Sequence, residues 1–174
     1  YGVQLSNQFG GIVEQSNNET QAILYWRRLP AHQAQPELSI QVLQDHSCRY
    51  LLLNGQRQGQ MHLKNPNSVT YPHLELLLQL LEPLCWRHLL QLGLGAGEFS
   101  RAVTSRWPER QLSTVEQNAT IVEVYQQFFL PVKTEQLLCT TAQQFCLQAL
   151  AQQLCYEVIF VDLYPWPADW AWLL

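Results

Sequence analysis

The chain has 174 residues, which is enough for one medium-sized domain or for a domain with a small appendage. Hydrophobic residues make up 47% of the chain and charged residues only 14%, so we expect a packed core beneath an amide-rich surface. The net charge of −4 disfavours nucleic-acid binding, which needs clustered Lys and Arg, and no apolar run is long enough to span a membrane.

The first part of the chain is typical of β-hairpins. Short strand-like runs alternate with turn signals, of which Asn54-Gly55 is the strongest. We therefore expect a small β-hairpin domain over residues 1–67. A helix is predicted next, over Leu74–Leu84, because apolar residues recur there at helical spacing between two prolines. The strand-like runs before it are Ala22–Trp26, Leu38–Leu43 and Arg49–Leu53.

From Trp86 onward the pattern changes to alternating strands and helices. Repeated βα units of this kind form parallel sheets with right-handed crossovers. We therefore expect an α/β, Rossmann-like domain over residues 68–174, with strand order 3-2-1-4 and further C-terminal strands missing. The last strand is continuously apolar, as expected when both faces are covered. The predicted strands are His88–Leu92, Gln111–Val115, Gln136–Cys139 and Tyr156–Val161, and the predicted helices are Glu98–Trp107, Ala119–Phe129 and Ala142–Leu154.

A glycine-rich turn joins the first of these strands to its helix. Gly93, Gly95 and Gly97 let the backbone turn tightly and approach a ligand, and the helix N-terminus favours an occupant with nucleotide character. Glu116 ends the next strand about twenty residues on, where dinucleotide-binding proteins place a carboxylate for the ribose hydroxyls. Glu98 stands where a dinucleotide site has its last glycine, so it would face a pyrophosphate.

This arrangement favours a nucleoside cofactor without phosphate. S-adenosylmethionine and its decarboxylated form are the candidates, and a tight turn in a domain without nucleotide is the alternative. Ligands of open α/β sheets bind beyond the carboxyl ends of the strands. We therefore expect the glycine turn, Glu116, Thr141 and Asp162 to meet in one crevice.

The cysteines give no sign of a metal site. The chain has five, and none forms a C-x-x-C pair, so zinc is not expected. We interpret them as small core residues of a cytoplasmic protein, because Cys139 and Cys155 fall in or beside predicted strands.

Several segments resemble the spermidine synthase family, the aminopropyltransferases built on a methyltransferase-type Rossmann domain. The resemblance extends over roughly Arg49 to Tyr164 and includes a β-hairpin domain before the Rossmann domain. The similar segments are Tyr50–Gln58, Tyr71–Leu77, Leu92–Gly97, Val115–Asn118 and Tyr156–Asp162.

The resemblance implies a role for each matching residue. Asp162 corresponds to the catalytic aspartate, and Gln58 to a ligand-binding glutamine at the end of the hairpin. The glycine turn would hold the amino-acid end of the cofactor, Glu116 the ribose, and Thr141 with Ala142 would lie where the family contacts the adenine. Tyr71, His73 and Tyr164 would lie near the substrate. The implied reaction transfers an aminopropyl group to a small amine.

The chain also departs from the family pattern. Ala96 replaces the aspartate that holds the cofactor's amine, and Pro165 replaces a second aspartate that grips a diamine. These departures leave two alternatives open, which are a methyltransferase acting on a small substrate and a non-catalytic member of the family. Three residues also have purely structural interpretations. Asp162 could cap the next segment, Gln58 could be a polar surface residue, and His73 could pack near the start of the helix.

We expect a homodimer. The fourth parallel strand would otherwise be an exposed edge, and such edges are rarely left unprotected. The predicted contact lies either at the N-terminal hairpins or at the Trp-rich segment 166–172.

Overall fold

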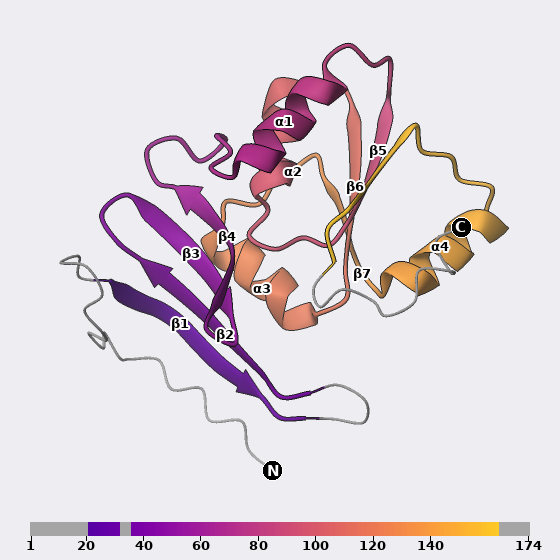
Figure 1. Cartoon of the computed structure of the whole chain (residues 1–174). Helices are drawn as coiled ribbons and strands as arrows, with labels where there is room; N and C mark the ends of the chain where they lie inside the picture. Colours follow the sequence, from indigo (N-terminus) through magenta and orange to yellow (C-terminus); the bar gives the residue numbers. More distant parts are fainter. Residues whose placement is uncertain (1–20, 32–35, 164–174) are drawn as a thin grey trace.

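A computed structural model describes residues 21–31 and 36–163, and Figure 1 shows the arrangement of its elements. In these ranges the chain is a mixed α/β protein with one antiparallel and one parallel sheet, each of four strands. Tyr164 and the segment 166–172 lie outside the described residues.

The antiparallel sheet has its strands in chain order. It contains β1 (Ala22–Leu29), β2 (Leu38–Gln44), β3 (Cys48–Leu53) and β4 (Gln56–His62). Asn54 and Gly55 both have positive φ angles, so the predicted turn joins β3 to β4. The β2–β3 turn is held by the Asp45 carboxylate, which accepts hydrogen bonds from the backbone N–H groups of Ser47 and Cys48, both at 2.7 Å.

The parallel sheet follows, with its strands ordered β7-β6-β5-β8. Leu89 pairs with Leu112 of β6 and with Val158 of β8, and both pairings are parallel, as the βα periodicity predicts. The strands are β5 (His88–Leu92), β6 (Gln111–Glu116), β7 (Gln136–Cys139) and β8 (Val158–Val161).

Within the described ranges, four helices pack around these strands: α1 (Pro72–Leu81), α2 (Glu98–Arg106), α3 (Ala119–Phe128) and α4 (Ala142–Ala151). Proline at its first position favours the start of α1, and Asn118 caps α3 by accepting a hydrogen bond from Thr120 N at 2.9 Å. None of the helices in the described ranges is long and apolar enough to cross a membrane.

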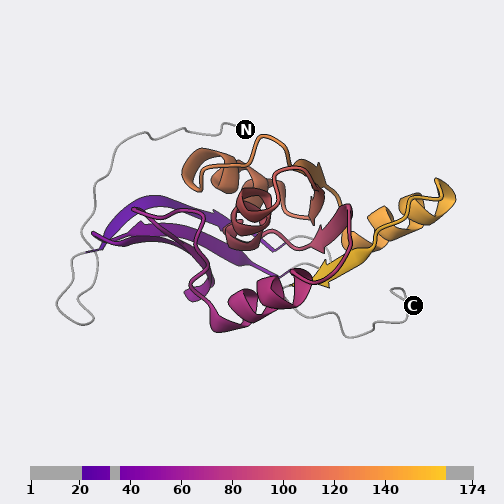
Figure 2. The ribbon, with the colours of Figure 1, turned by 90° about the horizontal axis from the view of Figure 1, so that it is seen from above.

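The core joins the two sheets. One apolar cluster packs β2, β3 and β4 against α3, which lies between the sheets in Figure 1. A second cluster packs α1 and α2 onto one face of the parallel sheet, and a third packs α4 onto the other. Figure 2 shows α1 and α4 at different sides of this sheet. The domain boundary near residue 67 stays a prediction.

Two expectations from the sequence are wrong. Strand β8 is shorter than predicted and is not covered on both faces, since Ile159 is 54% exposed in the described structure. The cysteines are not core residues: Cys85, Cys139 and Cys155 are exposed, and Cys48 and Cys146 are half-buried. An apolar strand at a sheet edge has the same composition as a central one, so periodicity alone cannot distinguish the two.

Candidate functional site

The glycine-rich turn lies at the carboxyl end of β5, as the sequence predicts. Gly93, Gly95 and Gly97 all have positive φ angles, a conformation that favours glycine. The turn is anchored at both ends, because Gly93 N donates to Val115 O at 2.8 Å and Gly97 N donates to Leu94 O at 3.0 Å. Its backbone is therefore fixed before any ligand arrives.

The three glycines differ in how closely other protein atoms approach them. A Cβ on Gly93 would lie 1.9 Å from the carbonyl oxygen of Asp162, and a Cβ on Gly97 would lie 2.1 Å from the ring of Tyr125. These two residues are glycine because protein atoms crowd them. A Cβ on Gly95 would make only an ordinary van der Waals contact, with Gln58 O at 3.4 Å, and Gly95 lines a pocket.

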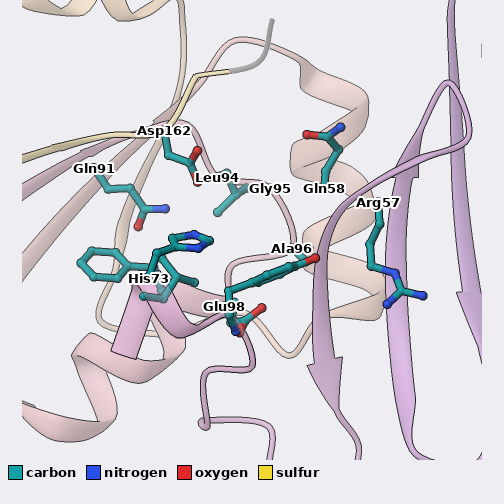
Figure 3. Close-up of a pocket in the computed structure, with 13 residues that line it drawn as sticks. Arg57, Gln58, His73, Gln91, Leu94, Gly95, Ala96, Glu98 and Asp162 are labelled. Atoms are coloured by element: carbon teal, nitrogen blue, oxygen red, sulfur yellow. The ribbon is translucent and has the colours of Figure 1, made fainter. Parts of the chain in front are cut away.

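This pocket has a volume of about 200 Å³ and lies between the glycine turn, β4, α1 and the end of β8. Figure 3 shows the side chains of Asp162, Gln91 and His73 on one side of it and those of Gln58 and Arg57 on the other. Its lining residues are Arg57, Gln58, Gly59, Tyr71, His73, Leu74, Gln91, Leu94, Gly95, Ala96, Glu98, Phe99 and Asp162.

Strand β4 closes the pocket because it approaches the glycine turn closely. A Cβ on Gly59 would lie 2.8 Å from the Cβ of Ala96, so only glycine lets the two backbones come this near. The approach places Gln58 over Gly95 and brings the antiparallel sheet into the site. The guanidinium of Arg57 stacks on the ring of Tyr50, 4.1 Å from its centroid.

Asp162 is the acidic group at the end of β8. Its backbone N–H donates to Leu92 O at 2.8 Å, which fixes the residue beside the glycine turn. The residue as a whole is exposed, yet burial of its carboxyl group raises the pKa, and the nearby charge of His73 partly offsets this effect. A carboxyl group with a raised pKa beside an imidazole is suited to accepting a proton.

Two buried polar residues line the pocket without having been predicted as ligand contacts, and these are Gln91 and Glu98. Gln91 interrupts an otherwise apolar strand, and its amide donates to Gly93 O at 2.7 Å and accepts from Ser100 Oγ at 2.9 Å. The lone amide in a leucine-rich strand was the signal. Glu98 lines the pocket, and its Oε1 accepts hydrogen bonds from the backbone and hydroxyl groups of Thr70, in the segment before α1.

Glu116 is turned toward the backbone. Its Oε2 accepts from Leu94 N at 3.2 Å and its Oε1 from Asn118 N at 2.8 Å, and it does not line the pocket. Burial raises the pKa of this carboxyl group, against the effect of hydrogen bonds from Asn118 and Leu94. Its contact with a ribose stays a prediction, although a carboxylate bonded in this way keeps free lone pairs.

The predicted crevice is therefore only partly assembled. Gln58, Tyr71, His73, Gly95 and Asp162 share the pocket, whereas Thr141 and Ala142 do not line it. Thr141 caps α4 by accepting from Gln144 N at 3.2 Å, and Ala142 is a buried residue at the first position of that helix. Among the described residues, no group of three or more His, Cys, Asp or Glu is placed to hold a metal ion.

Comparisons with known proteins place the fold. No family model matches the chain, and no curated protein does. A probable spermidine synthase from Corynebacterium glutamicum is similar in structure, with a TM-score of 0.63 and 14% identity over 91% of this chain and 53% of that one. Spermidine synthase from Thermotoga maritima has a TM-score of 0.60 and 13% identity over 93% and 58% of the two chains.

A third similar structure is a spermidine synthase in complex with the transition-state analogue AdoDATO, with a TM-score of 0.56 and 14% identity over 80% of this chain and 47% of that one. At such identities the similarity shows a Rossmann-like fold with an antiparallel sheet before it. The chain spans about half the length of the solved structures it matches.

Proposed function

We propose that this pocket binds S-adenosylmethionine or its decarboxylated form, and that the protein transfers an aminopropyl group from the latter to a small amine. The observation that carries the proposal is the position of Asp162, which lies beside the glycine turn and lines a pocket at the carboxyl ends of two parallel strands. The spermidine synthase structures with the same fold agree with this assignment.

The residues present fit such a ligand. Gly95 lines the pocket and has no side chain to cover its backbone, so a ligand can contact the backbone there. The titratable side chains of the lining include two carboxylates, Asp162 and Glu98, while the Arg57 guanidinium is stacked on Tyr50. A positively charged ligand matches this lining better than a phosphate does. Glu116, at the adjoining strand end, is our candidate for the ribose.

The chemistry that the ligand supplies is a carbon activated by the neighbouring sulfonium, whose C–S bond breaks as a new N–C bond forms. Asp162 accepts a proton from the incoming ammonium, and this frees the nitrogen lone pair for the attack. His73 and Tyr71 lie at the same side of the pocket, where they position the amine. Gln58 closes the opposite side, so that nucleophile and carbon are held in line.

Calorimetric titration tests the binding part of this proposal. The purified chain is titrated with S-adenosylmethionine, with its decarboxylated form and with methylthioadenosine. We expect at least one of them to bind with a dissociation constant below about 1 mM, equivalent to roughly 4 kcal/mol. Absence of binding of all three at millimolar concentration would rule the proposal out.

A methyltransferase acting on a small substrate is the second candidate. Ala96 favours it, because this residue fits the wider methyltransferase pattern better than the aminopropyltransferase pattern, which has an aspartate at this position. Product analysis separates the two reactions. Aminopropyl transfer releases methylthioadenosine from the decarboxylated ligand, and methyl transfer releases S-adenosylhomocysteine from S-adenosylmethionine.

A further inference from the structure

One oxygen atom in the pocket wall has no hydrogen-bond partner. Glu98 is only 4% exposed, and its Oε2 atom is buried and unpaired in the described structure. The other oxygen, Oε1, takes every hydrogen bond that the side chain makes, from Thr70 N, from Thr70 Oγ1 at 2.7 Å and from Tyr71 N at 3.3 Å. A buried carboxylate oxygen without a donor costs free energy, so its retention needs a reason.

The neighbouring cation does not supply that donor. Arg101, one turn further along α2, is fully buried, and its guanidinium donates to the backbone carbonyls of Pro66, Ala96 and Phe129. Its positive charge acts on Glu98 only through space. The unpaired oxygen therefore belongs to a side chain that lines the pocket and has a fixed orientation.

We propose that Glu98 Oε2 accepts a hydrogen bond from an ammonium group of the bound ligand and makes this residue the site's determinant for ligands that carry one. The inference rests on the proposed function, and it assigns one end of the ligand within the pocket. Ala96, the side chain that precedes Glu98 by two positions, offers neither donor nor acceptor. An ammonium supplies the missing donor and the charge that a buried carboxylate requires.

The substitution Glu98→Gln isolates this contact. The side-chain carbonyl of the introduced glutamine can still accept from Thr70 and Tyr71, since those donors leave no choice of orientation. Its amide nitrogen then occupies the position of Oε2, where it cannot accept a hydrogen bond and faces the ammonium with its own protons. The variant therefore keeps the hydrogen bonds that hold the segment before α1 and loses only the proposed acceptor.

The test compares two ligands that differ in the ammonium. Decarboxylated S-adenosylmethionine carries it, and methylthioadenosine does not. Calorimetry should show that Glu98→Gln weakens binding of the first by about tenfold to a hundredfold and binding of the second by less than about threefold. Thr70→Val, which removes one hydrogen bond to Oε1, is the matched control and should affect both ligands equally.

Each other outcome has a distinct meaning. If the unmodified chain binds neither ligand, the aminopropyl-transfer part of the proposed function fails, and this inference fails with it. If it binds both and Glu98→Gln leaves both affinities unchanged, solvent alone occupies the Oε2 position and the inference is overturned. An equal loss for both ligands, with a thermal midpoint like that of Thr70→Val, would reduce Glu98 to an anchor of the segment before α1 and would also overturn it.

Discussion

Asp162 carries the part of the proposed chemistry that depends on pH. Because its pKa is raised, a larger fraction of the carboxyl group is protonated at mildly acidic pH than in an ordinary aspartate. A base must be deprotonated to accept a proton, so kcat/KM should rise with pH through the raised pKa. This rise is measured as initial rates with the decarboxylated ligand and 1,4-diaminobutane over a range of pH values.

The variant Asp162→Asn should transfer the group roughly a hundredfold to ten-thousandfold more slowly, and its kcat/KM should no longer rise with pH in the acidic range. The free energy of unfolding should not fall, because the raised pKa means that the folded state disfavours the ionised carboxyl group above that pKa. The backbone hydrogen bond to Leu92 is unaffected by the change. An unaltered rate in the folded variant would remove Asp162 from the mechanism.

Asp45, in the turn between β2 and β3, has a lowered pKa, whereas the pKa of Asp162 is raised. Burial opposes its ionisation, but hydrogen bonds from Tyr50, Cys48 and Ser47 outweigh this and lower the pKa from 3.8 to about 2. The lowered pKa contributes about 2 kcal/mol of stability at neutral pH. That contribution is present above pH 3.8 and is lost as the pH falls toward 2.

Urea unfolding of Asp45→Asn against the unmodified chain measures this contribution. The variant should be less stable by about 2 kcal/mol at pH 7, and the difference should shrink as the pH is lowered through the range between the two pKa values. A difference that does not change with pH would mean that the turn is stabilised by shape alone and not by the charge of Asp45.

At the scale of elements, the approach of β4 to the glycine turn decides whether the pocket exists. Gly59→Ala places a Cβ against Ala96, so the strand must move by a few tenths of an ångström or more. We expect a loss of about 1–3 kcal/mol in the free energy of unfolding, as for other overpacked positions, together with weaker ligand binding. Denaturant unfolding and calorimetry measure the two effects.

The double variant Gly59→Ala with Ala96→Gly is the control for that contact. It removes the methyl group that the new Cβ meets, although the backbone nitrogen of residue 96 would still lie 3.1 Å away. Part of the lost stability should therefore return, as a coupling between neighbouring residues. Strictly additive losses would show that the two elements do not depend on this contact.

The sequence predicted the elements better than it predicted the site. Periodicity and turn residues are local signals, so the βα units and the hairpin at Asn54-Gly55 could be read directly. The pocket depends on how β4 and α1 pack on the glycine turn, and that packing has no local signal. The spacing predicts a carboxylate at Glu98 that disfavours a phosphate, but no local signal shows that one of its oxygens is held by the segment before α1.

Thr141 and Glu116 show the same limit. Both lie at strand ends where ligand contacts are common, but such residues also serve as caps and backbone acceptors. Thr141 caps α4, and Glu116 accepts from the glycine turn and from Asn118. The spacing of residues predicts where an oxygen atom lies along the chain, but it does not predict which donor forms a hydrogen bond to that oxygen.

For the whole molecule, the homodimer remains a prediction. The described structure exposes apolar side chains at the outer end of the parallel sheet, with Leu150 of α4 at 76% exposure and Ile159 of β8 at 54%. Burying such surface against a second copy would stabilise a dimer. Light scattering at micromolar concentration should give twice the chain mass of 20.2 kDa.

The variant Leu150→Lys tests whether this surface forms the contact. A charge in a dimer interface is costly, so the mass should fall toward that of one chain, while exposed Glu123→Gln on α3 should leave it unchanged. A single-chain mass for the unmodified protein over the whole concentration range would contradict the dimer.

The proposed function depends above all on where an adenosyl ligand binds. A crystal structure of the chain with methylthioadenosine answers this without assuming a reaction. We expect the thioether to lie beside Asp162 and Gly95, with Gln58 across the pocket and the ribose toward the end of β6. Ligand density at another place on the protein, or none in crystals at a concentration that saturates binding in solution, would contradict the assignment of this pocket.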